Sequence, residues 1–368
     1  MKILVLSSHT PSLFWFRTEM MKSFIECGYE VVAVGNESEE QWSEKFASLQ
    51  IKYRQAFIQR NGTNPLKDLK TLKNLKKIIA EEKPQKIFSY QAKTVIYGGI
   101  AARKYKNIDY YALIAGVGSV FLSKGIKARL IRAFLKIEYK IGLKKAKKVI
   151  FQNQDDVQLF LKNKLVKEKQ IEIINGSGVN LERFQKQPLP KEMIFLTISR
   201  LIRDKGVMEY LESARRIKNK YPNVKFMLVG PYDSNPSALN EEDLRPYIEG
   251  GVVEYFGEQA DVVPYLAQCS VYVLPSYREG IPKTVLEAMA SFKAIITTDA
   301  PGCRETVIDG ENGFLVPVKD VDALVERMEY FIQNRAIIEK MAEKGRILVE
   351  DKFDVKKIND KIKKIMEL

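Results

Sequence analysis

Two glutamates, Glu279 and Glu287, lie eight residues apart around a turn and could bind hydroxyl groups. The segment 274–290 ends an apolar run, turns at Gly280, and continues with the apolar spacing of a helix from about Lys283. The free N–H groups of a helix start can hold a phosphate, and a carboxylate can accept hydrogen bonds from two hydroxyls of a sugar or ribose. The competing interpretation makes Glu279 a helix-start charge and Glu287 a solvated side chain.

A second cluster, Arg200 and Lys205, follows another apolar run, at 193–200. The two side chains could converge on a diphosphate, the arginine through its fork and the lysine as a point charge. Two basic residues in a loop can also be merely solvated. One predicted strand end carries these cations, and another carries the carboxylates and the helix start. This combination favours a sugar-nucleotide site over merely solvated side chains.

Both clusters require parallel strands that end at one sheet edge. The chain has 368 residues, a length that suits two domains. Short apolar runs alternate with helical patterns on both sides of a proline-containing linker at 185–191, which predicts two doubly wound α/β domains. Ligands of such sheets bind beyond the carboxyl ends of the strands. The predicted strands are 2–8, 30–35, 52–57, 86–91, 110–116, 148–153 and 171–176, then 193–200, 224–230, 252–257, 271–276, 294–299 and 313–317.

Composition excludes several classes of protein. Hydrophobic residues make up 45% and charged residues 29% of the chain, which excludes a disordered or collagen-like protein. The three cysteines are far apart and form no CxxC pair, so a reducing cytosolic compartment is expected, with Cys303 a small buried residue. The first residues predict a strand instead of a signal peptide. No stretch approaches the roughly 20 apolar residues of a membrane-spanning helix.

The positive charge is confined to the first half of the chain. Residues 1–185 carry 33 Lys and Arg against 17 Asp and Glu, whereas the rest is nearly neutral, which predicts an anionic partner for one domain. The segment 124–148 holds ten basic residues and one acid, with the spacing of a basic amphipathic helix. Its apolar residues are Ile126, Leu130, Phe134 and Ile141, with Ile131 and Leu135, and its predicted membrane-contacting residues are Lys127, Arg132, Lys136, Lys140 and Lys144.

Three interpretations of this basic helix compete. It could pack on its sheet with a solvated basic face, it could bind nucleic acid, or it could bind an anionic membrane surface, which attracts each nearby basic residue by roughly 1 kcal/mol. No recognised nucleic-acid-binding module or aromatic-interleaved basic loop is present, so no nucleic-acid partner is expected. The membrane interpretation is preferred.

Arg200-x4-Lys205 followed by Glu279-x7-Glu287 resembles the retaining glycosyltransferases of family 4, which have the GT-B fold. The segments 230–237, 274–290 and 298–307 narrow the resemblance to the capsular-polysaccharide subgroup, and 115–121 and 175–180 agree with it. The resemblance implies two Rossmann-like domains that face a central cleft. It also implies a UDP-sugar donor and an undecaprenyl-diphosphate-linked acceptor at the inner face of the bacterial plasma membrane.

The resemblance also implies roles for matched positions. Arg200 and Lys205 would bind the donor diphosphate, Glu287 the ribose hydroxyls and Glu279 the transferred sugar, with Arg200, Lys205 and Glu279 also taken as catalytic. The remaining donor-binding residues are Glu258 and Gln259 near the base, and Gly280, Ile281, Pro282, Lys283 and Thr284 around the β-phosphate.

The first half departs from the family pattern in its loops. Ser7 to Ser12 replaces a glycine pair, and Asn180 stands where an acidic residue is common. The lone histidine, His9, follows the first strand, and both a structural and a catalytic role are considered for it. Predicted acceptor-binding residues are Thr10, Gly116, Gly118 and Ser119.

The sequence therefore predicts an acceptor- and membrane-binding domain at 1–187, a nucleotide-sugar domain at 188–352, and a C-terminal helix at 353–368 that could pack on the first domain. The predicted activity is a hexosyltransferase that moves an N-acetylhexosamine in surface-glycan or glycoprotein-glycan assembly. No Asp-x-Asp element occurs in a fitting loop, so catalysis without metal or cofactor is expected, with Arg200 and Lys205 stabilising the leaving charge. The alternatives are a sugar-nucleotide epimerase of the same fold and a non-enzymatic basic membrane- or nucleic-acid-binding protein.

Overall fold

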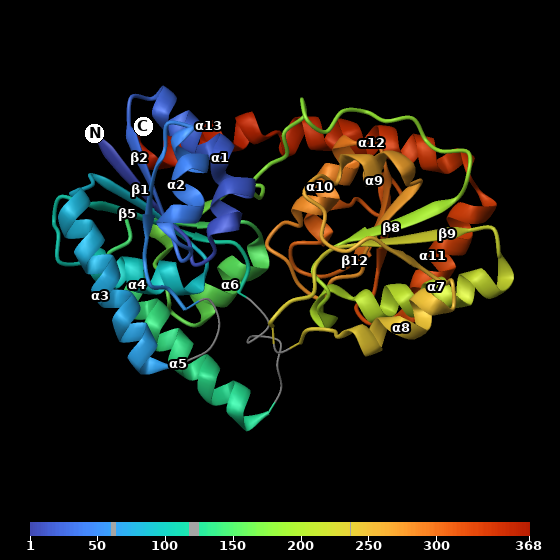
Figure 1. Ribbon diagram of the computed structural model, residues 1–368, viewed down its shortest axis with the longest axis horizontal. Coiled ribbons are helices and arrows are strands. Elements are labelled where there is room, and N and C mark those ends of the chain that lie inside the picture. The colour runs from blue at the N-terminus through green and yellow to red at the C-terminus, as the bar shows by residue number, and fades with distance from the viewer. Residues whose placement is uncertain (60–63, 118–124, 236) are drawn as a thin grey trace. The chain divides into compact units, whose positions relative to one another are not determined.

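The computed structural model describes residues 1–59, 64–117, 125–235 and 237–368. These residues form two compact units, 1–177 with 358–368 and 178–357 (Figure 1). The change of unit at Gly178 precedes the predicted linker, because Val179 and Phe184 already pack in the core of the second unit. Each unit contains one parallel sheet with helices on both faces, as the strand–helix alternation predicts.

In the described residues, the sheet of the first unit has seven parallel strands in the order β3-β2-β1-β4-β5-β6-β7. The strand order reverses between β1 and β4, which is the position at which such sheets open a ligand crevice. The strands are β1 (Lys2–Leu6), β2 (Glu30–Gly35), β3 (Lys52–Gln55), β4 (Lys86–Tyr90), β5 (Asp109–Ile114), β6 (Lys148–Phe151) and β7 (Ile171–Ile173).

Two apolar layers cover the faces of this sheet. One face packs against Leu13 and Phe24 of α1, Trp42 of α2, and Ile358 and Ile362 of α13. The other face packs against α3, α4, α5 and α6. The helices are α1 (Thr10–Glu26), α2 (Glu39–Ala47), α3 (Pro65–Glu82), α4 (Ala92–Ala102), α5 (Ile126–Leu143), α6 (Gln154–Lys162), the 3-10 turn η2 (Glu168–Gln170) and α13 (Val355–Met366).

The sheet of the second unit has six described parallel strands in the order β10-β9-β8-β11-β12-β13, and it reverses between β8 and β11. Its strands are β8 (Ile194–Ile198), β9 (Lys225–Val229), β10 (Glu254–Tyr255), β11 (Val271–Leu274), β12 (Ala294–Thr298) and β13 (Gly313–Val316). Its helices are η3 (Arg203–Lys205), α7 (Val207–Lys220), α8 (Glu241–Glu249), α9 (Val263–Gln268), α10 (Lys283–Ala290), η4 (Arg304–Thr306), α11 (Val321–Gln333) and α12 (Ala336–Lys352).

Local side-chain chemistry fixes where several helices begin. Asn64 caps α3 by accepting hydrogen bonds from backbone N–H groups, and Pro65 takes the first helical position, where its missing N–H costs nothing. Asn240 and Asp243 form a reciprocal capping box at α8. The first turns of α3 and α8 are therefore fixed by polar side chains that stand directly before or within them in the sequence.

Candidate donor site at the carboxyl edge of the second sheet

The loops that follow β8 and β11 lie side by side, because these strands are neighbours at the point where the strand order reverses. The backbone N–H of Tyr277 donates to the carbonyl of Asp204 at 2.9 Å. Gly206 has φ +71°, and a Cβ there would lie 2.0 Å from the carbonyl oxygen of Pro275. The close approach of the two loops therefore requires glycine at 206.

Lys205 and Glu279 meet across these loops. The Lys205 ammonium forms an ion pair with Glu279 Oε1, which also accepts a hydrogen bond from Ser276 Oγ at 2.8 Å. Both charged side chains are less than one-fifth exposed. The prediction that a cationic strand end lies beside a strand end that carries carboxylates is confirmed for this pair. Sequence reasoning missed Ser276, although its position at the end of β11 could have indicated it.

Glu287 is buried in α10, one turn after Lys283, whose ammonium lies 4.0 Å from the Glu287 carboxylate. Burial raises the pKa of Glu287 to about 7, and the charges of Lys283 and Arg183 oppose that rise. The interpretation of Glu287 as a solvated side chain is wrong. Apart from this long contact to Lys283, no hydrogen bond to the Glu287 carboxylate is seen in the described residues, so its oxygens can accept hydrogen bonds from ligand hydroxyls.

α10 begins at Lys283, as predicted, with Pro282 at its N-cap. Its first N–H groups face the turn that contains Gly280, Ile281 and Pro282. Thr284 is half-buried in the same first turn and lies near the hydroxyl of Tyr272 in β11. The backbone of this turn is therefore arranged to meet an anion, as the sequence predicts.

Glu279 and Glu287 lie close to the same buried group. The hydroxyl of Tyr272 donates to the carbonyl of Ile198 at 3.0 Å, between the ends of β11 and β8. Burial raises the pKa of Tyr272, and the charges of both glutamates raise it further. Both carboxylates are therefore near enough to Tyr272, at the reversal point of the sheet, for their charges to act on it.

Arg200, which is predicted to bind the donor diphosphate with Lys205, has a carboxylate partner of its own. Its guanidinium forms an ion pair with Asp233 at 2.7 Å, and its side chain is 40% exposed. Asp233 follows β9, the other neighbour of β8, so the strand-end argument applied to β9 could have predicted it. The structure therefore pairs Lys205, and not Arg200, with Glu279.

Glu258 and Gln259 follow β10 at the same sheet edge. Glu258 is exposed, and the Gln259 amide donates to the carbonyl of Phe256 at 2.6 Å. These positions leave the Glu258 carboxylate accessible.

Gly302 and Cys303 pack directly against the turn that carries Ser276 and Glu279. Gly302 has φ +83°, and a Cβ there would lie 2.4 Å from the carbonyl oxygen of Glu279. Cys303 is fully buried beside it, and burial raises the pKa of its thiol to about 12, so it stays protonated, as expected of a structural residue.

The predicted acceptor residues are only partly described. His9 is the half-buried N-cap of α1, and its carbonyl accepts from the Ser12 hydroxyl at 2.9 Å. Thr10 is buried, and its hydroxyl is hydrogen-bonded to Tyr53 at 2.8 Å. Gly116 is half-buried with φ +94°, and Gly118 and Ser119 lie outside the described residues.

The predicted membrane residues lie on or next to α5, which ends at Leu143, earlier than the charge pattern suggested. Arg132 and Lys136 are half-buried, Lys140 is exposed, and Lys144 is the exposed C-cap. The side chain of Lys127 lies outside the described set.

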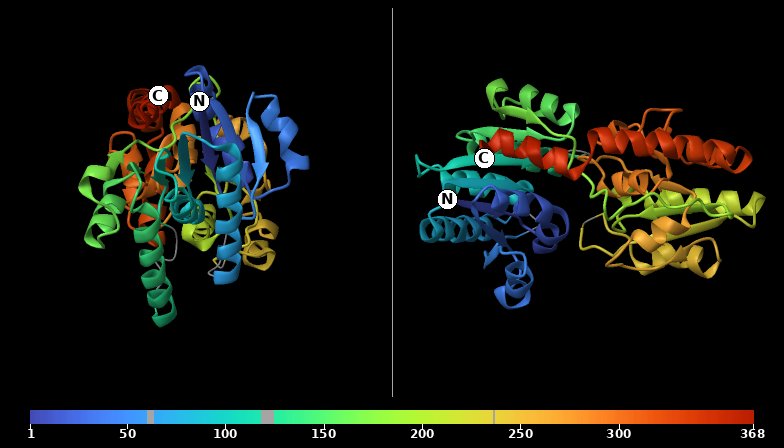
Figure 2. Two further views of the ribbon diagram at one scale, coloured as in Figure 1. Left: turned by 90° about the vertical axis from the view of Figure 1, so that its left-hand side faces the viewer. Right: turned by 90° about the horizontal axis from the view of Figure 1, so that it is seen from above.

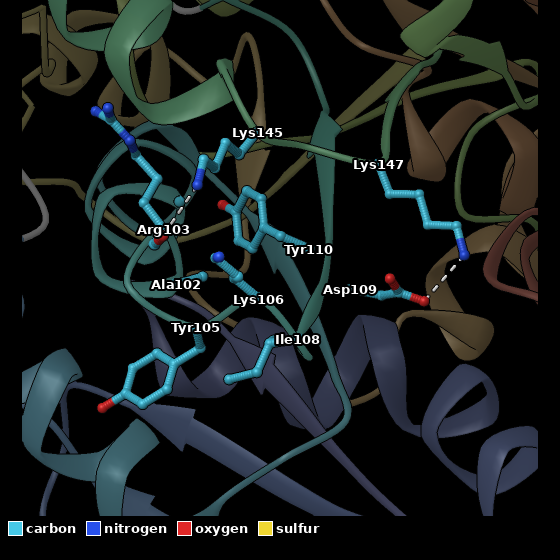
Figure 3. Close-up of a pocket in the computed structure, with 10 residues that line it drawn as sticks. Ala102, Arg103, Tyr105, Lys106, Ile108, Asp109, Tyr110, Lys145 and Lys147 are labelled. Carbon is cyan, nitrogen blue, oxygen red and sulfur yellow. Dashed lines mark hydrogen bonds and ion pairs between the residues drawn. The ribbon is translucent and has the colours of Figure 1, made fainter.

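A basic pocket lies in the first unit, at the amino end of β5, away from the carboxyl edge (Figure 3). Arg103, Lys106, Lys145 and Lys147 line it together with Asp109, which pairs with Lys147 at 3.0 Å. These cations follow the last turns of α4 and α5, where positive charge complements the helix dipoles. Of these cations, Lys145 donates to the carbonyl of Arg103 at the end of α4, and Lys147 pairs with Asp109 and Glu367.

The described residues hold neither a cluster of metal ligands nor a helix that could span a membrane. No group of three His, Cys, Asp or Glu side chains there converges as metal ligands. No described helix has the length and apolarity needed to cross a membrane.

The fold and site together define a class. Two Rossmann-like units with a cationic and carboxylate site at one strand-order reversal are typical of GT-B glycosyltransferases. Sucrose-phosphate synthase from Thermosynechococcus elongatus superposes with a TM-score of 0.82 at 19% identity, covering 100% of this chain and 98% of that one. This likeness confirms the predicted GT-B fold.

The chain belongs to the group 1, family 4-like glycosyltransferases. The model of glycosyl transferases group 1 matches residues 179–348, and the glycosyl transferase 4-like model matches residues 2–153. The N,N'-diacetylbacillosaminyl-diphospho-undecaprenol alpha-1,3-N-acetylgalactosaminyltransferase of Campylobacter jejuni is 32% identical over 92% of this chain and 91% of its own. An Escherichia coli UDP-Gal:alpha-D-GlcNAc-diphosphoundecaprenol alpha-1,3-galactosyltransferase is 25% identical over 81% of this chain and 79% of its own. The chain is an enzyme of the hexosyltransferase type, and neither the epimerase nor the non-enzymatic alternative is supported.

Proposed function

We propose that this enzyme moves an N-acetylhexosamine from a UDP-sugar to an undecaprenyl-diphosphate-linked saccharide, with retention of configuration and without a metal ion or cofactor. The observation that carries the proposal is the Lys205–Glu279 ion pair at the reversal point of the second sheet, with the buried Glu287 in the helix that follows the same strand as Glu279. The names of the two relatives support the lipid-linked acceptor, and that of the Escherichia coli enzyme supports a UDP donor.

The donor would bind through complementary charges. Glu287 would accept hydrogen bonds from the ribose hydroxyls, and the first N–H groups of α10 would meet the β-phosphate. The Lys205 ammonium would leave part of its contact with Glu279 to pair with the diphosphate, which lets Glu279 face the transferred sugar. Arg200 could join the diphosphate after releasing Asp233.

Transfer would follow from this arrangement. The bond from the anomeric carbon to the diphosphate oxygen breaks, and a bond to the acceptor oxygen forms on the same face of the sugar. The acceptor proton passes to the leaving phosphate oxygen, so no protein base is needed for that step. Lys205 and the α10 amides stabilise the negative charge that grows on the leaving UDP, which is the role a metal ion would otherwise have.

A membrane-binding role for the first unit rests on α5 and α3. Ile126, Leu130, Phe134 and Ile137 of α5 are 82%, 67%, 44% and 58% exposed, so the apolar stripe of this helix faces solvent. The buried side of α5 is instead formed by other residues, such as Tyr139 and Leu143. Packing on the sheet therefore does not explain the amphipathic pattern.

The N-terminal turns of α3 carry a matching surface. Leu66 and Leu69 are 80% and 63% exposed, next to exposed Lys67 and Lys70. Both helices follow strands of one parallel sheet, so both begin at its carboxyl edge, and their N-terminal ends extend to the same side of the unit (Figures 1 and 2). An apolar surface with flanking cations suits the headgroup region of an anionic bilayer.

Buried polar contacts hold this surface together. Lys93 of α4 pairs with Asp68 of α3 at 2.6 Å, and Tyr97 of α4 donates to Glu138 of α5. The three helices are therefore tied to each other, and the apolar and basic residues are presented on a rigid support. We infer that this surface binds the inner face of the plasma membrane, where the acceptor lies.

The function is tested by offering a panel of radiolabelled UDP-sugars with undecaprenyl-diphosphate-linked saccharides and isolating lipid-linked product. A UDP-N-acetylhexosamine should give product with wild-type enzyme, and the Lys205→Ala variant should lose most of it. Lys340→Ala, a change at an exposed lysine of α12, is the matched control. Failure of every UDP-sugar with every lipid-linked acceptor would refute the proposal.

The membrane surface is tested by sedimentation with anionic vesicles. Replacing Leu130 and Phe134 by Ser should release the enzyme from vesicles, whereas Ile347→Ser, a change at an exposed apolar residue of α12, should not. Replacing the cations should also weaken binding, by about 1 kcal/mol per charge, and raised salt should imitate that loss. The four replaced by Gln are Arg132, Lys136, Lys140 and Lys144. If both variants sediment with vesicles as the wild type does, α5 does not contact the membrane and its exposed face is merely solvated.

A further inference from the structure

The carboxyl edge of the first sheet also has a polar cluster at its reversal point, between β1 and β4. Gln91 Oε1 accepts from the hydroxyls of Ser7 and Ser8 at 2.9 and 2.8 Å, and the Gln91 amide donates to Ser12 Oγ at 3.1 Å. Ser12 Oγ is in turn hydrogen-bonded to the Tyr90 hydroxyl at 2.7 Å. This cluster joins the ends of β1 and β4 to the start of α1.

The backbone of Gln91 is strained to make this cluster. Its φ of +71° is unfavourable for a residue with a side chain. The four hydrogen bonds that its side-chain amide makes to Ser7, Ser8 and Ser12 offset the strain. Strained residues held by their surroundings cluster at ligand sites.

Arg17 lies beside this cluster and is only 4% exposed. Its guanidinium lies 5.0 Å from the centre of the Tyr90 ring, and its Nε has no hydrogen-bond partner. Side chains on a helix tilt toward its N-terminus, so Arg17 extends from α1 toward Ser12 and the strand ends. In the described residues no carboxylate forms an ion pair with Arg17. Burial lowers the pKa of Arg17. Arginine nevertheless remains charged in proteins.

Two other buried charges of the same unit have counter-charges. Lys93 has Asp68, and Glu82 is held by Lys2, Lys52 and Arg54. A buried charge that lacks a counter-charge is costly, and the cost is recovered when an anion arrives. Arg17 therefore has the properties of a binding residue whose partner is a ligand.

We propose that Arg17, with the polar cluster of Ser7, Ser12 and Gln91, binds a phosphate of the diphosphate group of the lipid-linked acceptor. This inference rests on the proposed function, which supplies an acceptor with a diphosphate. The donor diphosphate has its own cation, Lys205, in the second unit. The guanidinium fork of Arg17 suits two phosphate oxygens, and the hydroxyls and amide nearby can donate to others.

The test separates ligand binding from a structural role by two measurements on Arg17→Met. Without ligand, the variant should unfold at the same or a higher temperature, because an unpaired buried charge has been removed. In the transfer assay, the KM for the lipid-linked acceptor should rise roughly tenfold to hundredfold, because charge-assisted hydrogen bonds are lost. The KM for the UDP-sugar should not change.

Two further variants complete the design. Arg17→Lys keeps the positive charge but loses the two-pronged guanidinium group, so its KM for the acceptor should lie between those of wild type and Arg17→Met. If Arg17→Met fails to fold, Arg17→Lys takes its place in the test. Arg103→Met, a change at a half-buried arginine at the end of α4, should leave both KM values unaltered. A lowered unfolding temperature with an unchanged acceptor KM in Arg17→Met or Arg17→Lys would overturn the proposal.

A binding arm keeps the inference testable if transfer itself is not observed. In the Lys205→Ala background, which weakens the donor site, inorganic diphosphate and a short-chain prenyl diphosphate-linked sugar are each tested for thermal stabilisation. The prenyl-linked ligand should stabilise this protein, and adding Arg17→Met should abolish the shift. Stabilisation by inorganic diphosphate alone, or stabilisation that survives Arg17→Met, would contradict an acceptor site at Arg17.

Discussion

Glu287→Gln should remove a pH dependence from nucleotide binding. Burial holds the pKa of Glu287 at about 7 in the free protein, above its usual 4.5. Such a group stabilises the fold below pH 4.5 and loses that contribution as the pH rises through 7. Ribose hydroxyls donate to the ionised carboxylate, so bound UDP should lower this pKa and expel a proton. UDP affinity should then rise with pH, by a factor on the order of one hundred between about pH 5 and pH 8 if the pKa returns to its usual value.

Calorimetry with UDP in buffers of different ionisation enthalpy measures both the affinity and the proton released. Wild-type enzyme should release up to one proton near pH 6, and Glu287→Gln should release less and bind about tenfold to hundredfold more weakly at pH 8. The phosphate of UDP titrates near pH 6 as well, so the variant supplies the baseline. Glu249→Gln, a change at an exposed glutamate of the same unit, should behave as wild type. Equal proton release from Glu287→Gln and wild type would refute the placement of the ribose at Glu287.

Lys205→Ala and Arg200→Ala should lower kcat more than they raise the Kd for UDP, because the negative charge on the leaving diphosphate grows in the transition state. A change in KM with unchanged kcat would show that the two residues only bind the donor. Gly302→Ala should lower Tm by several degrees and weaken UDP binding, since its Cβ would displace the Glu279 carbonyl, and an unaltered Tm would contradict this. A thiol reagent should modify exposed Cys27 quickly in the folded enzyme and the two buried cysteines only on unfolding; rapid reaction of Cys303 would contradict its burial.

The strands were predictable from sequence because each is a short buried run between helical patterns. All thirteen predicted runs overlap strands in the described part of the chain. The strand-end rule also predicted that the loops of Lys205 and Glu279 adjoin, since neighbouring parallel strands bring distant loops together. The pairing of Lys205 with Glu279 needed the strand order, which places β8 beside β11.

Other features required three-dimensional structure. The strand-end rule makes Asp233 a candidate partner of Arg200, but β8 has β9 on one side and β11 on the other, and spacing does not choose between the loops of these two neighbours. The periodicity of α5 shows that it is amphipathic but does not show which stripe is buried, and the exposed stripe includes Leu130. Arg17 looks like an ordinary helix cation in the sequence, and only its burial without a counter-charge distinguishes it.

The central claim is that the donor nucleotide binds at the reversal point of the second sheet. A crystal structure of the enzyme with UDP tests it most directly. The ribose hydroxyls should lie within hydrogen-bond distance of the Glu287 carboxylate, and the diphosphate should lie between Lys205 Nζ and the first N–H groups of α10. UDP bound elsewhere, with the Lys205–Glu279 pair intact and Glu287 unliganded, would contradict the account.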